Sequence, residues 1–205
     1  GIAGILNYKN SYSGLVCMQK QLNHRGPDDK DLYFDESNYI GLVHTRLSII
    51  DLSPNGHQPM WSEDKRYIIV FNGEIYNYQF IKQKLLKIGQ SFSSTSDTEV
   101  LLKGYQVWGK DILQMLNGMF AFAIWDTKEK KIFIARDRFG EKPLYYYQND
   151  NKLIFASEIR TLLESGLVPR ILNNKILPEF LAFASVHFPN TLVKGIKLLH
   201  PGSYL

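Results

Sequence analysis

Cysteine is nearly absent from this chain. Cys17 is the single cysteine among 205 residues, so no internal disulfide can form. Long hydrophobic runs are absent as well, because the longest apolar segment, Met119 to Trp125, has only the length of a strand. No basic region followed by a hydrophobic segment opens the sequence, so no secretory signal is visible. These absences argue against a disulfide-stabilised secreted domain and a helical membrane protein. We expect a cytoplasmic location and no membrane partner.

A strong excess of one charge is also lacking. Lys and Arg number 24 against 20 Asp and Glu, and the net charge of +4 is spread along the chain. The densest basic run, Lys128 to Lys131, contains Glu129 and lies between two predicted strands. A hairpin turn explains this run better than a nucleic-acid surface does. The histidines show no spacing typical of metal ligands, so we expect neither a nucleic-acid partner nor a bound metal.

What is present is a globular composition, with 44% hydrophobic and 21% charged residues, and no repeat or linker divides the chain. The predicted strands are Gly1 to Leu6, Ile40 to Arg46, Tyr67 to Asn72, Met119 to Asp126, Lys131 to Arg136, Pro143 to Tyr147 and Leu153 to Ala156. The predicted helices are Leu15 to Asn23, Ile75 to Ile88 and Thr98 to Trp108. Strands early and late with helices between them favour an α+β layered fold. The first strand is apolar almost throughout, so its sheet should be covered on both faces.

Asn72-Gly73-Glu74 follows an apolar run and precedes a helical pattern, which predicts that it lies at a strand end. Asn-Gly is a common tight-turn pair, so a turn is one interpretation. The other is an oxyanion hole, in which the Asn72 side-chain amide and the Gly73 backbone N–H donate to a developing negative charge.

Asp97 and Arg46 each allow two interpretations as well. Asp97 stands in the first turn of a helix that Ser96 and Glu99 cap, where the helix dipole favours an acid. Its carboxylate also suits an α-ammonium group. Arg46 ends an apolar strand, where it either extends from the sheet edge into solvent or binds a carboxylate with its planar guanidinium.

Taken together, several motifs resemble the class II glutamine amidotransferases, which are N-terminal-nucleophile glutaminases. The motifs are Gly1-Ile2-Ala3-Gly4, His24-Arg25-Gly26-Pro27-Asp28, His44-Thr45-Arg46-Leu47-Ser48-Ile49, Phe71-Asn72-Gly73-Glu74-Ile75-Tyr76-Asn77 and Ser96-Asp97-Thr98-Glu99. Two later segments, Asn117 to Asp126 and Arg136 to Tyr146, together with Phe155 to Ile159, are similar to the glutamine-hydrolysing asparagine synthetase B branch. The resemblance covers essentially the whole chain.

This resemblance implies a four-layer αββα sandwich and assigns the roles of the candidate residues. Arg46 would hold the α-carboxylate of L-glutamine. Asp97 would hold the α-ammonium, with Glu74 and the Gly73 backbone nearby, and Asn72 and Gly73 would form the oxyanion hole. The residues that would wall the pocket are Leu47, Ser48, Ile49 and Ile50.

In the family the mature chain begins with Cys followed by Gly-Ile, so Gly1 matches the second position. We therefore expect the nucleophilic cysteine immediately before Gly1, whether it is disordered, chemically modified or removed. A chain that begins at Gly1 should bind glutamine without hydrolysing it. Cys17 lies in an amphipathic segment and is predicted to pack as a small buried hydrophobe rather than to replace that nucleophile.

The resemblance further implies a C-terminal synthetase domain of the same full-length chain, which would use ATP and Mg²⁺. No Walker-type or other pyrophosphate-binding loop occurs in the sequence, so no cofactor is expected in this domain. We expect residues 1–205 to form one glutamine amidotransferase domain, with 173–205 as the junction to the synthetase domain. A homodimer is left open.

Glutamine hydrolysis that supplies ammonia for converting aspartate to asparagine is the function that this pattern favours. One alternative keeps the glutaminase and changes the acceptor, to a sugar acid or to a precursor of an antibiotic or polysaccharide. The other is a non-catalytic glutamine-binding domain. The complete set of Arg46, Asn72, Gly73 and Asp97 argues against that second alternative.

Overall fold

Two antiparallel sheets organise the chain, and the computed structural model describes residues 1–47 and 54–205. The six-stranded sheet has the order β10-β8-β9-β1-β3-β2, and the four-stranded sheet has the order β4-β5-β6-β7. The strands of the first are β1 (Ile2–Leu6), β2 (Asp29–Asp35), β3 (Ile40–Arg46), β8 (Tyr145–Asn149), β9 (Lys152–Ala156) and β10 (Ile196–Leu198). Those of the second are β4 (Met60–Trp61), β5 (Tyr67–Ile75), β6 (Gly118–Asp126) and β7 (Lys131–Arg136).

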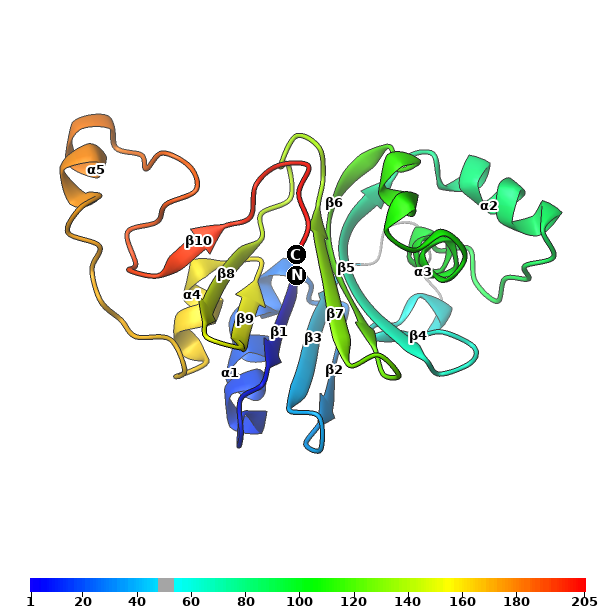
Figure 1. The fold of residues 1–205 in the computed structure, drawn as a ribbon, viewed down its shortest axis with the longest axis horizontal. Coiled ribbons are helices and arrows are strands. Elements are labelled where there is room, and N and C mark those ends of the chain that lie inside the picture. Colours follow the sequence, from blue (N-terminus) through cyan, green and yellow to red (C-terminus); the bar gives the residue numbers. More distant parts are fainter. Residues whose placement is uncertain (48–53) are drawn as a thin grey trace.

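Helices cover the outer face of each sheet, as Figure 1 shows. The six-stranded sheet carries α1 (Tyr12–Leu22) and α4 (Ile159–Glu164), and the four-stranded sheet carries α2 (Tyr78–Lys87) and α3 (Asp97–Trp108). Among the described residues, the 3₁₀ helices η1 (Asn23–Arg25), η2 (Pro54–Gly56) and η3 (Gly109–Gln114) lie in connections. The predicted four-layer αββα sandwich is therefore confirmed.

Three apolar clusters hold these layers together. The middle cluster joins the facing sides of the two sheets, with Ile2 and Leu42 from one sheet and Val70 and Trp125 from the other. The outer clusters join each sheet to its helices. Strand β1 contributes to two clusters, because alternate side chains point to opposite faces. Its coverage on both faces confirms the expectation from its unbroken apolar sequence.

Most predicted elements are present, but several bounds differ. Strand β5 continues to Ile75, so α2 begins only at Tyr78. The sequence analysis missed β2, β4, β10 and α4. β2 begins with three charged residues and is only half-buried, β4 and β10 are very short, and α4 has about one and a half helical turns. The 173–183 region contains α5 (Leu177–Phe183), which has no buried residue and lies away from the sandwich in Figure 1.

The connection from β7 to β8 is built around Arg136 and Asp137. The Asp137 carboxylate accepts hydrogen bonds from the backbone N–H groups of Phe120, Phe139, Glu141 and Lys142. The Arg136 guanidinium donates to the carbonyl oxygens of Gly140, Lys142 and Leu199. These two buried side chains therefore shape the loop between the sheets and hold it against β6.

In the part of the chain that is described, no helix is long and apolar enough to cross a membrane.

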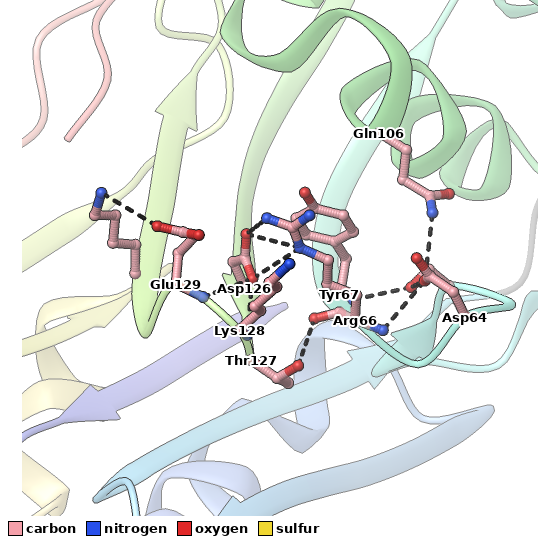
Figure 2. Close-up of polar contacts among 10 residues, drawn as sticks. Asp64, Arg66, Tyr67, Gln106, Asp126, Thr127, Lys128 and Glu129 are labelled. Carbon is pink, nitrogen blue, oxygen red and sulfur yellow. Dashed lines mark hydrogen bonds and ion pairs between the residues drawn. The ribbon is translucent and has the colours of Figure 1, made fainter.

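The basic run Lys128 to Lys131 lies at the β6–β7 hairpin, as predicted, with Lys128 to Lys130 in the turn and Lys131 as the first residue of β7. Asp126 Oδ1 accepts hydrogen bonds from the N–H groups of Lys128 and Glu129 at 2.9 and 3.0 Å. Arg66 donates to the same carboxylate, with Nη2 at 2.7 Å from Oδ2 (Figure 2). Burial opposes ionisation of Asp126, but the Arg66 hydrogen bonds and the turn N–H groups lower its pKa to about 2.

We predict that Asp126→Asn lowers the free energy of unfolding by about 1 kcal/mol, because a partly exposed charge-assisted pair is broken. Glu129→Gln is the matched control, since Glu129 pairs with Lys131 at 3.9 Å in the exposed part of the same turn, and such pairs contribute about 0–1 kcal/mol. Urea unfolding at neutral pH measures both variants. The Asp126 contribution should disappear as the pH falls from about 4 to about 2. Equal effects of the two substitutions would contradict this assignment.

Candidate functional site

A cavity of about 260 Å³ lies where the ends of β1 and β3 meet the middle of β5 and the start of α3. It is slightly smaller than pockets for drug-sized ligands, which measure about 300–1,000 Å³. Six residues that the sequence analysis singled out line it: Arg46, Leu47, Asn72, Gly73, Glu74 and Asp97. The structure therefore gathers three separate motifs around one small cavity. The other predicted pocket residues, Ser48, Ile49 and Ile50, lie outside the described residues.

Arg46 is the last residue of β3, where the strand reaches the cavity. Its guanidinium packs against Gly56 of η2, and a Cβ atom at position 56 would lie 2.1 Å from Nη2 of Arg46. Any larger residue at 56 would displace the guanidinium. Leu47 follows with 56% of its surface exposed, so it lies at the rim of the cavity.

Asn72, Gly73 and Glu74 lie inside β5, paired with Ala121, Phe120 and Met119 of β6. The predictions of a strand end and of a tight turn at this position are both wrong, because pairing with β6 continues as far as Ile75. Gly73 is required by the close approach of β6: a Cβ atom there would lie 2.1 Å from the Met119 carbonyl oxygen. Strand geometry, not turn geometry, thus positions this motif.

Asn72 carries an unused hydrogen-bond donor. Its Nδ2 atom is buried and has no partner among residues 1–47 and 54–205. A buried amide without a partner costs about 1–3 kcal/mol, so such groups are rare unless a ligand satisfies them. Since Asn72 lines the cavity, its amide is available to a polar group of a bound molecule.

Asp97 begins α3, and the Oγ of the N-cap residue Ser96 accepts from Glu99 N–H at 3.2 Å, which is one half of the predicted capping box. The other half is not formed, because Ser96 N–H donates to Ser94 Oγ and the Glu99 carboxylate accepts from Ser94 N–H. Asp97 is 5% exposed and accepts a hydrogen bond from Ile75 N–H at 2.9 Å. Burial raises the pKa of its carboxyl to about 6, although backbone hydrogen bonds oppose the shift and Glu74 adds to it. A carboxylate held this way gains strongly from a nearby cation.

Gly1 extends the pairing of β1 with β3 by one residue. Its nitrogen donates to Thr45 O at 2.7 Å, and Thr45 N–H donates to Gly1 O at 2.9 Å. Because Ile2 pairs with His44, a residue before Gly1 would stand opposite Arg46.

The sequence analysis assigned no role to several residues that line the cavity. His44, Thr98 and Lys142 lie in its motifs without a role, and Gln58 was missed altogether. His44 could have been found, because residues two apart on a strand share a face and Arg46 was already a candidate. Gln58, Thr98 and Lys142 are brought to the cavity by loops and a helix start, so their sequence positions do not indicate that they line it.

Cys17 does not pack in the core, so that prediction is wrong. The buried face of α1 carries Gly14, Leu15, Met18 and Leu22, whereas Cys17 is exposed outside that face.

Arg25 lines the cavity, and its Nη1 donates to Glu158 at 2.9 Å. Among the described residues, no group of three or more His, Cys, Asp or Glu side chains could hold a metal ion.

One cavity thus offers a guanidinium, a buried carboxylate and an unused amide donor. This combination suits a small zwitterion, whose carboxylate pairs with the guanidinium and whose ammonium pairs with the carboxylate. The amide donor is then left for a polar atom of the side chain of that molecule.

Comparison with solved structures places the fold. The chain superimposes on glutamine phosphoribosylpyrophosphate amidotransferase from B. subtilis with a TM-score of 0.63 and 23% identity, over 80% of this chain and 43% of that one. An enzyme described as the allosteric regulatory enzyme of purine biosynthesis gives a TM-score of 0.59 and 22% identity, over 80% of this chain and 43% of that one. At such identities the likeness concerns the fold alone.

Sequence relatives are closer. The chain is 41% identical over 186 residues to asparagine synthetase [glutamine-hydrolyzing] 1 of Bacillus subtilis, which covers 91% of this chain and 29% of that protein. It is 43% identical over 181 residues to putative asparagine synthetase [glutamine-hydrolyzing] 2 of Methanocaldococcus jannaschii, covering 80% and 35%. Amidase chry2 of Gibberella zeae is 38% identical over 182 residues, covering 89% and 26%.

The chain therefore spans only about a third or less of the length of these curated relatives. A family model described as the glutamine amidotransferase domain matches residues 1–205. The chain belongs to the glutamine amidotransferase domain family.

Proposed function

We propose that this domain hydrolyses L-glutamine to glutamate and ammonia and delivers the ammonia to a synthetase domain of the same full-length protein. The observation that carries the proposal is the cavity that unites Arg46 and Asp97 with the unused amide of Asn72. The family match and the glutamine-hydrolysing synthetases among the relatives support it.

In the proposed complex, Arg46 binds the α-carboxylate of glutamine through its planar guanidinium. Asp97 binds the α-ammonium, with Glu74 adding negative charge nearby. Leu47 lies at the rim, and we assign Ser48, Ile49 and Ile50 to the pocket wall on the family resemblance alone. These contacts leave the side-chain carboxamide of glutamine to reach β5.

The proposed nucleophile is a cysteine immediately before Gly1. Opposite residues of an antiparallel pair point to the same face, so this cysteine would share the face of Arg46 and of Ile2. Ile2 packs between the two sheets, which is the side on which β5 lies. The register of β1 and β3 therefore supports a thiol directed toward the oxyanion donors.

The proposed reaction has two steps. The thiol loses its proton to the chain's own α-amine, and the sulfur attacks the carboxamide carbon of glutamine. An amine pKa of about 8 and a thiol pKa of about 8.5 make this exchange easy near neutral pH. Asn72 and Gly73 stabilise the oxyanion, the C–N bond breaks, and the amine returns the proton to the leaving ammonia. Water then hydrolyses the thioester to release glutamate and the thiol.

For the acceptor we propose aspartate, which an ATP- and Mg²⁺-dependent synthetase domain would convert to asparagine. The names of the Bacillus and Methanocaldococcus relatives support this acceptor. Residues 173–205 are assigned to the junction, because α5 carries no buried residue and Leu181 and Phe183 are 74% and 66% exposed. Deleting α5 from a full-length protein without loss of coupling would remove the junction assignment.

A second candidate keeps the glutaminase and changes the acceptor. The match to amidase chry2, whose name does not specify asparagine, favours keeping this candidate. The two candidate acceptors are distinguished by assaying the full-length protein for amide formation on aspartate and on other carboxylates. Amidation of aspartate supports the first candidate, and amidation of another carboxylate supports the second.

The first prediction concerns the nucleophile. A protein with a free N-terminal cysteine before Gly1 is expected to release glutamate and ammonia from glutamine. The same protein with alanine at that position should bind glutamine but release no glutamate, because it has no thiol to form the thioester. Mass spectrometry verifies each N-terminus, and calorimetry measures binding. Equal glutamate release by the two proteins would show that the cysteine is not the nucleophile.

The second prediction concerns Asp97 and pH. Its carboxyl has a raised pKa of about 6, and only the ionised form pairs with an α-ammonium. Glutamine affinity in the alanine variant should therefore fall as the pH drops below about 6, and binding near this pH should release a proton. Calorimetry in buffers of different ionisation enthalpy measures that proton.

Asp97→Asn is the matched control for this second prediction. Asparagine keeps the size of the side chain but cannot ionise, so the variant should bind glutamine weakly and without this pH dependence. The raised pKa also predicts that the Asp97 contribution to folding stability decreases as the pH rises from 3.8 to about 6. An Asn variant with the same affinity and pH profile as its parent would contradict the role of Asp97.

A further inference from the structure

Strand β5 is longer than its neighbour β4, and this leaves part of its edge without a paired strand. Met60 and Trp61 of β4 pair only with Ile69 and Ile68, whereas β5 continues to Ile75. In the described part of the chain, no other strand pairs with this edge of β5. The backbone groups that point to this edge after Ile69 therefore need other partners.

The odd-numbered residues Phe71, Gly73 and Ile75 direct their backbone groups to this open edge. Tyr76 N–H bonds to Asn117 O, which lies just before β6, so even-numbered residues point to β6. Alternate residues of a strand point their N–H and C=O groups to opposite sides. Gly73 N–H thus points away from β6, between the N–H groups of Phe71 and Ile75.

Side chains take the place of a neighbouring strand on either side of Gly73. Phe71 N–H donates to Gln58 Oε1 at 2.7 Å, and Phe71 O accepts from His44 Nε2 at 3.1 Å. Ile75 N–H donates to Asp97 Oδ2 at 2.9 Å. Gln58 and His44 are only 5% and 4% exposed, so these bonds are shielded from water.

The chemistry of these contacts fixes the state of both side chains. A carbonyl oxygen only accepts, so Nε2 of His44 carries the proton, and burial keeps the ring neutral by lowering its pKa well below the ordinary value. Since Phe71 N–H only donates, Gln58 must present its oxygen to β5. Its Nε2 is then free to donate to Thr98 Oγ1, at 3.3 Å, beside Asp97.

We propose that Gln58 and His44 are positioning residues for the oxyanion hole. By bonding both backbone groups of Phe71, they fix the peptide that leads into Asn72, and hence the directions of the Asn72 amide and the Gly73 N–H. This inference rests on the proposed function of Asn72 and Gly73. Gln58 also connects this strand through Thr98 to the helix start that carries the ammonium-binding carboxylate.

The kinetic test uses the protein with cysteine before Gly1 and two pairs of variants. Gln58→Met has similar length and makes neither bond, whereas Gln58→Glu keeps an acceptor for Phe71 N–H. His44→Asn removes the Nε2 donor, whereas His44→Gln places an amide nitrogen near the position of Nε2. Gln58→Met and His44→Asn should lower kcat by about 10- to 100-fold, because small displacements of catalytic donors are costly. Their conservative counterparts should recover most of that loss.

Glutamine affinity separates positioning from a general structural role. Measured in the background with alanine before Gly1, the dissociation constant should change less than about threefold in Gln58→Met and His44→Asn, since Arg46 and Asp97 are untouched. If affinity falls as much as kcat does, or if kcat stays at the parent value, the positioning role is wrong.

A readout independent of hydrolysis keeps the inference testable if the parent protein proves inactive. Amide hydrogen exchange at Phe71 should be faster in Gln58→Met than in the parent, while exchange at Ile69, which β4 covers, stays unchanged. Equal exchange at Phe71 in the two proteins would overturn the inference. Failure of the parent to hydrolyse glutamine would instead count against the proposed function, so the two failures are distinguishable.

Discussion

The site depends on one constraint: β5 must stay extended for several residues beyond the strand that pairs with its outer edge. A free strand edge needs partners for its backbone groups. Here Gln58, His44 and Asp97 supply them from a loop, a strand of the other sheet and a helix start. Because these partners are side chains and not a strand, the space beside Gly73 stays open as a cavity. The same feature that maintains β5 therefore creates the binding site.

Asp97 links the scaffold to the ligand. Its carboxylate bonds Ile75 N–H, yet burial makes its ionised form costly, so its pKa is raised to about 6. A bound ammonium group would compensate for that cost, whereas an empty site leaves it uncompensated. The Asn72 amide N–H is also buried without an acceptor, and this unsatisfied donor lowers stability in the same way. Stability lost at these two positions is consistent with a site kept in shape for a ligand and not for folding.

The sequence predicted the layered arrangement of sheets and helices, and it predicted the site residues that stand at the ends of clear strand and helix patterns. The bounds of β3 were predicted in full, because the apolar stretch that begins at Ile40 is followed by residues compatible with a strand as far as Arg46. The sequence-based predictions failed where the local structure depends on contacts between residues that are far apart in the chain. At Asn72 and Gly73 a strand end was predicted and a turn was left open, because only the pairing with β6 reveals a continuous strand. Gln58 carries no local pattern, since its role depends on β4 beginning only at Met60. Cys17 was misplaced because successive residues of a helix point about 100° apart, so Cys17 is exposed although the adjacent Met18 is buried.

The central claim is that one cavity holds glutamine by both charged ends and presents its carboxamide to Asn72 and Gly73. The most direct measurement is a crystal structure of the variant with alanine before Gly1, grown with L-glutamine. The account predicts the α-carboxylate on Arg46, the α-ammonium on Asp97, and the carboxamide oxygen within hydrogen-bond distance of Asn72 Nδ2 and Gly73 N. Glutamine bound elsewhere, or with its carboxamide turned away from β5, would contradict it.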